Sequence, residues 1–417
     1  MRLSIKGERI IGEIEAISSK SIFHRALILA SFSEKKIKIS FNALSKDILK
    51  TLEILNSLGT KLTVKKQYVE ICKGNPICDV DINFGESGSS LRFLLPYIFL
   101  HDRKAVFSAE GRLSERPIKD LVEQISKNGV NLSSKKLPFT GRGSFYQEDK
   151  VFRFPGNISS QYISGILMIA PFMKGKTRIT IEGKLESKPY VDMTIKIMKD
   201  FGLIVSENDF GYEVCGEQKI KDIRTYTIEG DYSNSATFIA SGIIGGEIII
   251  RNLNYPSIQG DSKIIEEILK SGGNIEIFKD YVIVKKSDIK GFDIDCSDIP
   301  DLVPVLSVLA HYSTEKSILR NVNRLRLKES DRIESLLNLF ERVGGDCKYI
   351  NGDLHIEPAR LHGNRIESFN DHRIVMAATV VAVLSQEEVE IDGFEAIEKS
   401  YPDYVEKLKK IGMEVID

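Results

Sequence analysis

The chain has 417 residues, of which 42% are hydrophobic and 28% are charged, and its formal net charge is −1. This length indicates more than one domain, and the near-neutral charge excludes the overall basic field of a typical nucleic-acid-binding protein. The sequence has no apolar run long enough to span a membrane, and its N-terminal residues lack the apolar core of a signal peptide. We therefore expect a cytoplasmic protein with neither nucleic acid nor membrane as a partner.

The cysteines argue against a structural disulfide framework or a metal centre. They are odd in number and scattered, with no CxxC pair and no histidine at zinc-ligand spacing: Cys72, Cys78, Cys215, Cys296 and Cys347. A reducing compartment fits this usage best, and we expect no metal.

Taken in chain order, one pattern recurs: an amphipathic helical stretch ends in glycine, and an alternating strand follows. The glycines are spaced 68–73 residues apart: Gly59, Gly129, Gly202, Gly272, Gly344 and Gly412. Glycine just past a helix adopts the left-handed conformation that other residues adopt only at a steric cost. We interpret the pattern as six copies of one α/β unit of about 70 residues.

Each copy also contains a second helical stretch that is apolar nearly all round. These stretches are residues 26–33, 91–100, 163–173, 235–244, 303–310 and 374–384. A helix of that kind is buried. The sequence therefore predicts two similar α/β domains of three units each, with buried helices inside and sheets outside.

Polar residues collect in the turns before these helices. The segments 18–25, 85–92, 156–161 and 370–373 combine glycine and serine with lysine or arginine. Helix N-termini favour anions, because their free N–H groups and the helix dipole point at the ligand. A single turn of this type is more often only a helix cap, but several converging turns favour a site for an anionic substrate.

The segment 324–332 is the most charged of these turns, with four cations and two carboxylates before an amphipathic helix that ends at Gly344. Ser330 and Asp331 are candidate caps for that helix. By itself the segment is typical of a solvated surface turn. The recurrence of similar turns favours a place in an anion site.

Ten ordered motifs from about residue 14 to residue 404 resemble the 5-enolpyruvylshikimate-3-phosphate synthase family (3-phosphoshikimate 1-carboxyvinyltransferases). They are SKSIFHRAL, GESGSSLRF, GRLSERP, ISSQY, SKPYVD, EGDYSNSA, IPD, LKESDRI, NDHR and KSYPDY. The resemblance implies two inside-out α/β domains, each of three βαβαββ-type units. It places one domain at residues 19–228, binding mainly shikimate 3-phosphate. The other domain, residues 1–18 plus 229–417, would carry phosphoenolpyruvate-binding and proton-transfer residues.

The resemblance also implies roles for individual residues. Those expected to bind the two substrates are Lys20, Ser21, Arg25, Gly88, Arg116, Ser159, Ser160, Gln161, Ser187, Tyr190, Asp301, Lys328, Arg332, Arg373 and Lys399. Those expected to act in catalysis are Lys20, Asp301, Lys328, Glu329 and His372. Asp301, assisted by Lys328, would accept the proton of the shikimate 5-hydroxyl, and Glu329 would lie by the phosphoenolpyruvate methylene with His372 nearby.

The implied reaction transfers the enolpyruvyl group of phosphoenolpyruvate to the 5-hydroxyl of shikimate 3-phosphate, on the route to chorismate and the aromatic amino acids. It passes through a tetrahedral intermediate, needs no cofactor and is expected of a monomer whose domains close on substrate. Some motifs depart from the family pattern: Ser18 and Ser19 replace a Pro-Gly pair, Ser89 replaces threonine, and Arg324 replaces an asparagine.

Two alternatives remain. The sister transferase that acts on UDP-N-acetylglucosamine has a Lys-Asn pair in its first motif and a cysteine in its mobile loop. This chain has Lys20-Ser21 there and no cysteine in residues 111–117. A non-catalytic anion-binding scaffold is the other alternative, and the presence together of Asp301, Lys328 and Glu329 argues against it.

Overall fold

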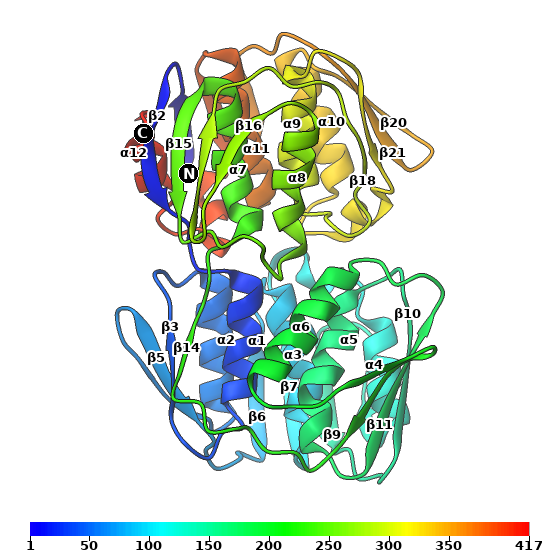
Figure 1. The fold of residues 1–417 in the computed structure, drawn as a ribbon. Coiled ribbons are helices and arrows are strands. Elements are labelled where there is room, and N and C mark those ends of the chain that lie inside the picture. The colour runs from blue at the N-terminus through cyan, green and yellow to red at the C-terminus, as the bar shows by residue number, and fades with distance from the viewer. Residues whose placement is uncertain (417) are drawn as a thin grey trace. The chain divides into compact units, whose positions relative to one another are not determined.

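The computed structural model describes residues 1–416, and the chain divides into two compact units (Figure 1). The continuous unit is Ser19–Ile228, and the split unit combines Met1–Ser18 with Glu229–Asp417. No helix among the described residues is both long enough and apolar enough to cross a membrane.

Three four-stranded sheets belong to the continuous unit, with orders β14-β3-β5-β4, β6-β7-β9-β8 and β10-β11-β13-β12. Their strands are β3 (Ile37–Ser40), β4 (Lys61–Val64), β5 (Tyr68–Cys72), β6 (Asp79–Asn83), β7 (Arg103–Ser108), β8 (Val130–Leu132), β9 (Phe139–Gly143), β10 (Lys150–Pro155), β11 (Lys176–Glu182), β12 (Ser206–Asn208), β13 (Gly211–Cys215) and β14 (Thr225–Thr227).

Three further four-stranded sheets belong to the split unit, with orders β2-β15-β17-β16, β18-β19-β21-β20 and β22-β23-β1-β24. Their strands are β1 (Arg2–Lys6), β2 (Ile10–Glu15), β15 (Gly246–Arg251), β16 (Asn274–Ile277), β17 (Tyr281–Lys285), β18 (Asp293–Asp295), β19 (Ser317–Arg320), β20 (Asp346–Ile350), β21 (Asp353–Glu357), β22 (Arg365–Glu367), β23 (Val389–Asp392) and β24 (Glu414–Ile416).

All six sheets share one topology. The first two strands pair in parallel, and the remaining neighbours pair antiparallel. Two of the sheets need strands from distant parts of the chain: β14 completes the sheet that contains β3, and β1 enters the sheet that contains β23. Alternating burial, as in β17, shows that one face of such a strand packs on the helices while the other faces solvent.

Two sets of helices lie within these sheets in each unit (Figure 1). The largely buried helices are α1 (Lys20–Ala30), α3 (Gly88–Ile98), α5 (Ser160–Ile169), α7 (Tyr232–Gly245), α9 (Val303–Tyr312) and α11 (His372–Ser385). The amphipathic helices are α2 (Lys46–Ser57), α4 (Lys119–Lys127), α6 (Lys188–Asp200), α8 (Lys263–Lys270), α10 (Arg332–Val343) and α12 (Tyr404–Lys410). Helices α3 and α5 pack together in the continuous unit, and α7, α9 and α11 pack pairwise in the split unit.

Five short 3-10 helices complete the description: η1 (Gly111–Ser114), η2 (Ala170–Phe172), η3 (Gly260–Ser262), η4 (Asn323–Leu327) and η5 (Phe394–Lys399). The six glycines that end the amphipathic stretches all have positive φ, between 77° and 109°. This confirms the left-handed conformation predicted for them.

The buried helices begin before the apolar runs that predicted them. Helix α1 starts at Lys20 rather than near residue 26, and α5 starts at Ser160 rather than near residue 163. The first turn of each helix is polar, so apolar periodicity alone does not reach it. In α1 and α5 the missed turn carries candidate site residues.

Candidate active site

In the continuous unit, the N-terminal turns of α3 and α5 are joined by side-chain hydrogen bonds. Gln161 Nε2 donates to Ser89 Oγ at 3.0 Å, and Arg92 Nη1 donates to Gln161 Oε1 at 3.2 Å. Free N–H groups and buried cations therefore meet at one place, which is the arrangement that binds an anion.

Gly88, the first residue of α3, is in close contact with two guanidinium groups. A Cβ at this position would lie 2.6 Å from Arg92 Nη1 and 2.7 Å from Arg116 Nη1. Any larger residue would push these side chains away. The predicted residues Gly88, Arg116 and Gln161 are thus brought together, and Arg92 joins them.

Lys20, the first residue of α1, forms an ion pair with Asp47 on α2, with Nζ and Oδ2 2.9 Å apart. Both side chains are largely enclosed, being 16% and 11% exposed. Because the carboxylate holds the lysine in one direction, Asp47 orients a predicted catalytic residue. Serine at position 45 caps α2 and fixes the turn that carries Asp47.

Arg25 is fully buried, and its guanidinium is directed at protein acceptors. Its Nε donates to Thr194 Oγ1 at 2.7 Å, and its terminal nitrogens donate to the carbonyls of Ser21 at 2.7 Å and Tyr190 at 3.1 Å. Burial lowers the pKa of Arg25 to about 10. The predicted trio Ser21, Arg25 and Tyr190 is therefore one connected group, in which Arg25 ties the start of α1 to the start of α6.

The three serines expected to hold the shikimate phosphate lie at helix starts. Ser159 caps α5 by accepting a hydrogen bond from the Gln161 N–H, and Ser160 is the first residue of that helix. Ser187 precedes α6 in the left-handed conformation, with φ of 57°. A non-glycine residue in that conformation is uncommon, and such residues often mark functional sites.

In the split unit, Asp301 is surrounded by cations. Its Oδ1 accepts hydrogen bonds from Lys328 Nζ at 3.1 Å and Arg332 Nη1 at 2.8 Å, and Arg373 Nη2 lies 3.9 Å from its Oδ2. These four predicted residues come from the turn before α9, the segment before α10, and the first turns of α10 and α11. Four helix-associated segments thus converge on one carboxylate.

Arg332 is held in place by a second carboxylate, that of Asp371. Its Nε donates to Oδ2 at 2.8 Å and its Nη2 donates to Oδ1 at 3.2 Å. The backbone N–H and hydroxyl of Ser330 also donate to Oδ2, at 3.2 and 3.1 Å. Ser330 is therefore not the helix cap that the sequence suggested as one possibility; Asp331 caps α10 by accepting from the Glu334 N–H.

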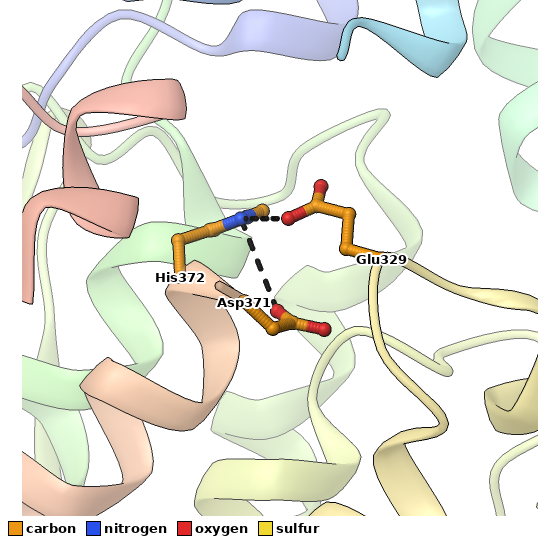
Figure 2. A group of neighbouring side chains, drawn as sticks. All are labelled: Glu329, Asp371 and His372. Atoms are coloured by element: carbon orange, nitrogen blue, oxygen red, sulfur yellow. Dashed lines mark hydrogen bonds and ion pairs between the residues drawn. The ribbon is translucent and has the colours of Figure 1, made fainter. Parts of the chain in front are cut away.

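Glu329 and His372 form a pair beside this network (Figure 2). His372 Nδ1 lies 2.8 Å from Glu329 Oε2 and 4.0 Å from Asp371 Oδ1. The histidine is 2% exposed and the glutamate 16%. A carboxylate and an imidazole in hydrogen-bond contact can exchange a proton, so this pair has the composition of a general acid–base device.

Glu329, Asp371 and His372 also have a spacing that could hold a metal ion, since their ligand atoms all lie within 4.8 Å of one another. The environment of Asp371 argues against this use. Its two oxygens already accept five hydrogen bonds, two from the Arg332 guanidinium and the others from Ser330 and the Arg373 N–H. The cluster is therefore better suited to proton transfer than to metal binding.

Charges in the split unit shift the pKa values of two of the predicted catalytic groups. Burial opposes ionisation of Asp301, but Lys328, Arg332 and Arg373 outweigh it and hold the pKa of the carboxyl well below its ordinary value. Burial lowers the pKa of the Lys328 ammonium to about 8, although Asp301 acts in the opposite direction. A lysine with that pKa readily gains and loses a proton near neutral pH.

Lys399, at the end of η5, donates from Nζ to the Asn370 carbonyl at 2.7 Å. This contact places it next to the turn that begins α11. The structure thus connects the last predicted substrate-binding residue to the segment that carries His372 and Arg373.

Three residues that hold the site were not singled out from the sequence: Asp47, Arg92 and Asp371. Each lies within or beside a charged helix start, but charge alone does not show which partner a side chain meets. A rule that assigned every buried cation of the motifs a carboxylate or amide partner would have pointed to them.

A model of the EPSP synthase (3-phosphoshikimate 1-carboxyvinyltransferase) family matches residues 5–408. Relatives of that name include one from Clostridium novyi, 36% identical and covering 96% of this chain and 95% of its own length. One from Clostridium acetobutylicum is 37% identical, covering 97% and 96%. One from Methanocaldococcus jannaschii is 34% identical, covering 98% of each.

Solved structures agree at the level of fold. EPSP synthase from Acinetobacter baumannii has a TM-score of 0.83 at 22% identity, and each chain covers all of the other. The enolpyruvyl transferase NikO from Streptomyces tendae has a TM-score of 0.78 at 15% identity, covering 100% of this chain and 98% of its own. The inside-out α/β architecture is thus confirmed, and the chain belongs to the EPSP synthase family of 3-phosphoshikimate 1-carboxyvinyltransferases, transferases of the shikimate pathway.

Proposed function

We propose that Asp301, Lys328 and Glu329 carry the protons when this chain transfers the carboxyvinyl group of phosphoenolpyruvate to the 5-hydroxyl of shikimate 3-phosphate. The observation that carries the proposal is the ionised Asp301 carboxylate, which is bound by Lys328 and Arg332. A carboxylate fixed in this way is a base of defined direction, and the lysine beside it has a pKa suited to passing a proton on.

The reaction needs one proton removed and one supplied. The 5-hydroxyl attacks C2 of phosphoenolpyruvate and loses its proton to Asp301, while C3 gains a proton from Glu329, which His372 contacts. The resulting tetrahedral intermediate loses phosphate and then a proton from the methyl group, so the acid that protonated C3 serves as the base in the second step. Cations fixed before the reaction stabilise the departing phosphate.

The two units divide the binding work. The continuous unit binds mainly shikimate 3-phosphate, through Ser159, Ser160 and Ser187 with Tyr190 beside the ring. Its other charged helix starts, with Lys20, Arg25, Arg116 and Gln161, serve the substrate anions. In the split unit, Arg332, Arg373 and Lys399 bind phosphoenolpyruvate. The protein acts as a cytoplasmic monomer without a cofactor.

The direct test mixes the protein with both substrates and follows phosphate release. Release must depend on shikimate 3-phosphate and must not occur when UDP-N-acetylglucosamine replaces it. Asp301→Asn keeps the size of the side chain and should lower kcat by about 10²- to 10⁴-fold, which is the usual contribution of a general base. The proposal is wrong if the wild type releases no phosphate with saturating substrates.

A further inference from the structure

Asp261 is a buried carboxylate in the split unit to which the proposed mechanism gives no role. It lies in η3, just before α8, and is 1% exposed. Its Oδ2 accepts a hydrogen bond from the Ser233 hydroxyl in the first turn of α7. An ionised carboxylate in such a place is costly unless nearby groups compensate for its lost hydration, so its neighbours decide its state.

Ser233 connects Asp261 to the proposed site. Its backbone carbonyl accepts a hydrogen bond of 2.5 Å from Arg373 Nη1, and the other terminal nitrogen of that guanidinium lies 3.9 Å from Asp301 Oδ2. Arg373 is itself buried, with a side chain that is 5% exposed. The path from Asp261 to the proposed base therefore contains one serine and one arginine.

The charged groups that face Asp261 come from three other elements and act in opposite directions. Asp301, before α9, and Asp231, which caps α7, repel a negative charge at this position, while Arg373 on α11 and the Ser233 hydroxyl stabilise it. Burial is the largest influence. Together they raise the pKa of Asp261 to about 7.

We propose that Asp261 is a positioning residue for the carboxyvinyl transfer, acting through Ser233 on Arg373 and contributing a switchable charge beside Asp301. The inference rests on the proposed function, because it takes Arg373 as a phosphoenolpyruvate-binding residue. It adds a group that touches neither substrate and controls how strongly the Arg373 cation is available to one of them.

The sign of the effect follows from the charges. A protonated Asp261 leaves the Arg373 charge available to the substrate anion. Ionisation adds a negative charge near that cation and weakens binding of phosphoenolpyruvate. The KM for phosphoenolpyruvate should therefore rise as the pH passes upward through about 7. An added charge about 12 Å away at an effective dielectric constant of about 20 corresponds to roughly tenfold.

The test compares the wild type with Asp261→Asn between pH 5.5 and 9 at saturating shikimate 3-phosphate. Asparagine keeps an acceptor for Ser233 and cannot ionise. The ratio of the two KM values for phosphoenolpyruvate cancels the ionisation of the substrate itself. We expect a ratio near one below pH 6 and a wild-type KM roughly three- to tenfold higher than that of the variant above pH 8.

Two further variants separate charge from structure. Ser233→Ala removes the hydrogen bond that favours the ionised carboxylate, so the midpoint of the KM change should move to higher pH. Asp295→Asn is the matched control, because Asp295 is an exposed, hydrogen-bonded aspartate of the same unit, and it should leave the pH dependence unchanged.

A KM ratio that is constant across the pH range, or a midpoint unmoved by Ser233→Ala, overturns the role of Asp261. If Asp261→Asn does not fold, the Ser233→Ala measurement decides alone. These outcomes differ from failure of the proposed function, which would appear as absence of phosphate release in the wild type itself.

Discussion

Glu329 has a chemical role that can be separated from a structural one. Its carboxylate contacts His372 at 2.8 Å and is 16% exposed, so removing it leaves little buried surface unfilled. We predict that Glu329→Gln and Glu329→Ala both lower kcat by about 10²- to 10⁴-fold while the melting temperature stays within a few degrees of the wild type. Glu334→Gln, an exposed change one turn into α10, is the control and should keep full activity. Wild-type turnover in Glu329→Ala would remove the proposed role.

The Lys328 ammonium gives the reaction an alkaline limit. Its pKa is lowered to about 8 by burial, so the group is charged below that pH and neutral above it. If the charged form is required, kcat should fall as the pH rises through about 8. Lys328→Arg cannot lose its proton in this range, and although its geometry lowers kcat, its alkaline limb should lie above pH 9.5. A limb at the same pH in both proteins would assign it to another group.

Sequence reasoning reached the residues with recognisable chemistry better than the residues that hold them. Lys328 and Arg332 stand in a charged helix start that is visible in the sequence. Asp371, which binds Arg332, lies 39 residues further along the chain, and nothing local indicates that the two meet. Pairings of this kind depend on how α10 and α11 pack, which only the folded chain determines.

At the scale of the helix, the left-handed glycines can be tested individually. Gly344 ends α10 with φ of 77°. We predict that Gly344→Ala lowers the free energy of unfolding by about 1 kcal/mol, because alanine adopts this conformation at a steric cost of that size. Gly344→Asn should cost less, because asparagine tolerates the conformation better. Denaturant unfolding measures both, and the activity per folded molecule should not change. An alanine variant as stable as the wild type would contradict the argument.

Glycines and apolar runs made the helices predictable, but their polar first turns were not. Apolar periodicity placed the first buried helix near residue 26, whereas α1 begins at Lys20. The side chains in that first turn are selected for the site rather than for the core. The error in the helix boundary therefore fell on the residues that matter most for function.

Strand exchange links distant parts of the chain, and at the scale of the whole molecule it makes the two units unequal. The continuous unit contains every strand of its three sheets within residues 19–228, including β14, which pairs with β3. The split unit needs β1 and β2 from the N-terminal segment, and Arg2 pairs with Asp392 across 390 residues. Such long-range pairing leaves no local sequence signal.

This inequality predicts different outcomes when the chain is divided. A fragment of residues 19–228 should fold alone, because it retains all its sheets, and under the proposed division of binding it should bind shikimate 3-phosphate. A fragment of residues 229–417 lacks β1, an interior strand between β23 and β24, and β2, which pairs with β15. Its backbone groups there would be unpaired and its helices uncovered, so it should be unfolded. Circular dichroism with thermal melting tests folding, and calorimetric titration tests binding. Adding a peptide of residues 1–18 is the control, since it supplies both strands and should restore structure to the second fragment. A 19–228 fragment that does not fold, or a 229–417 fragment that melts cooperatively without the peptide, would show that the exchanged strands do not decide the stability of each unit.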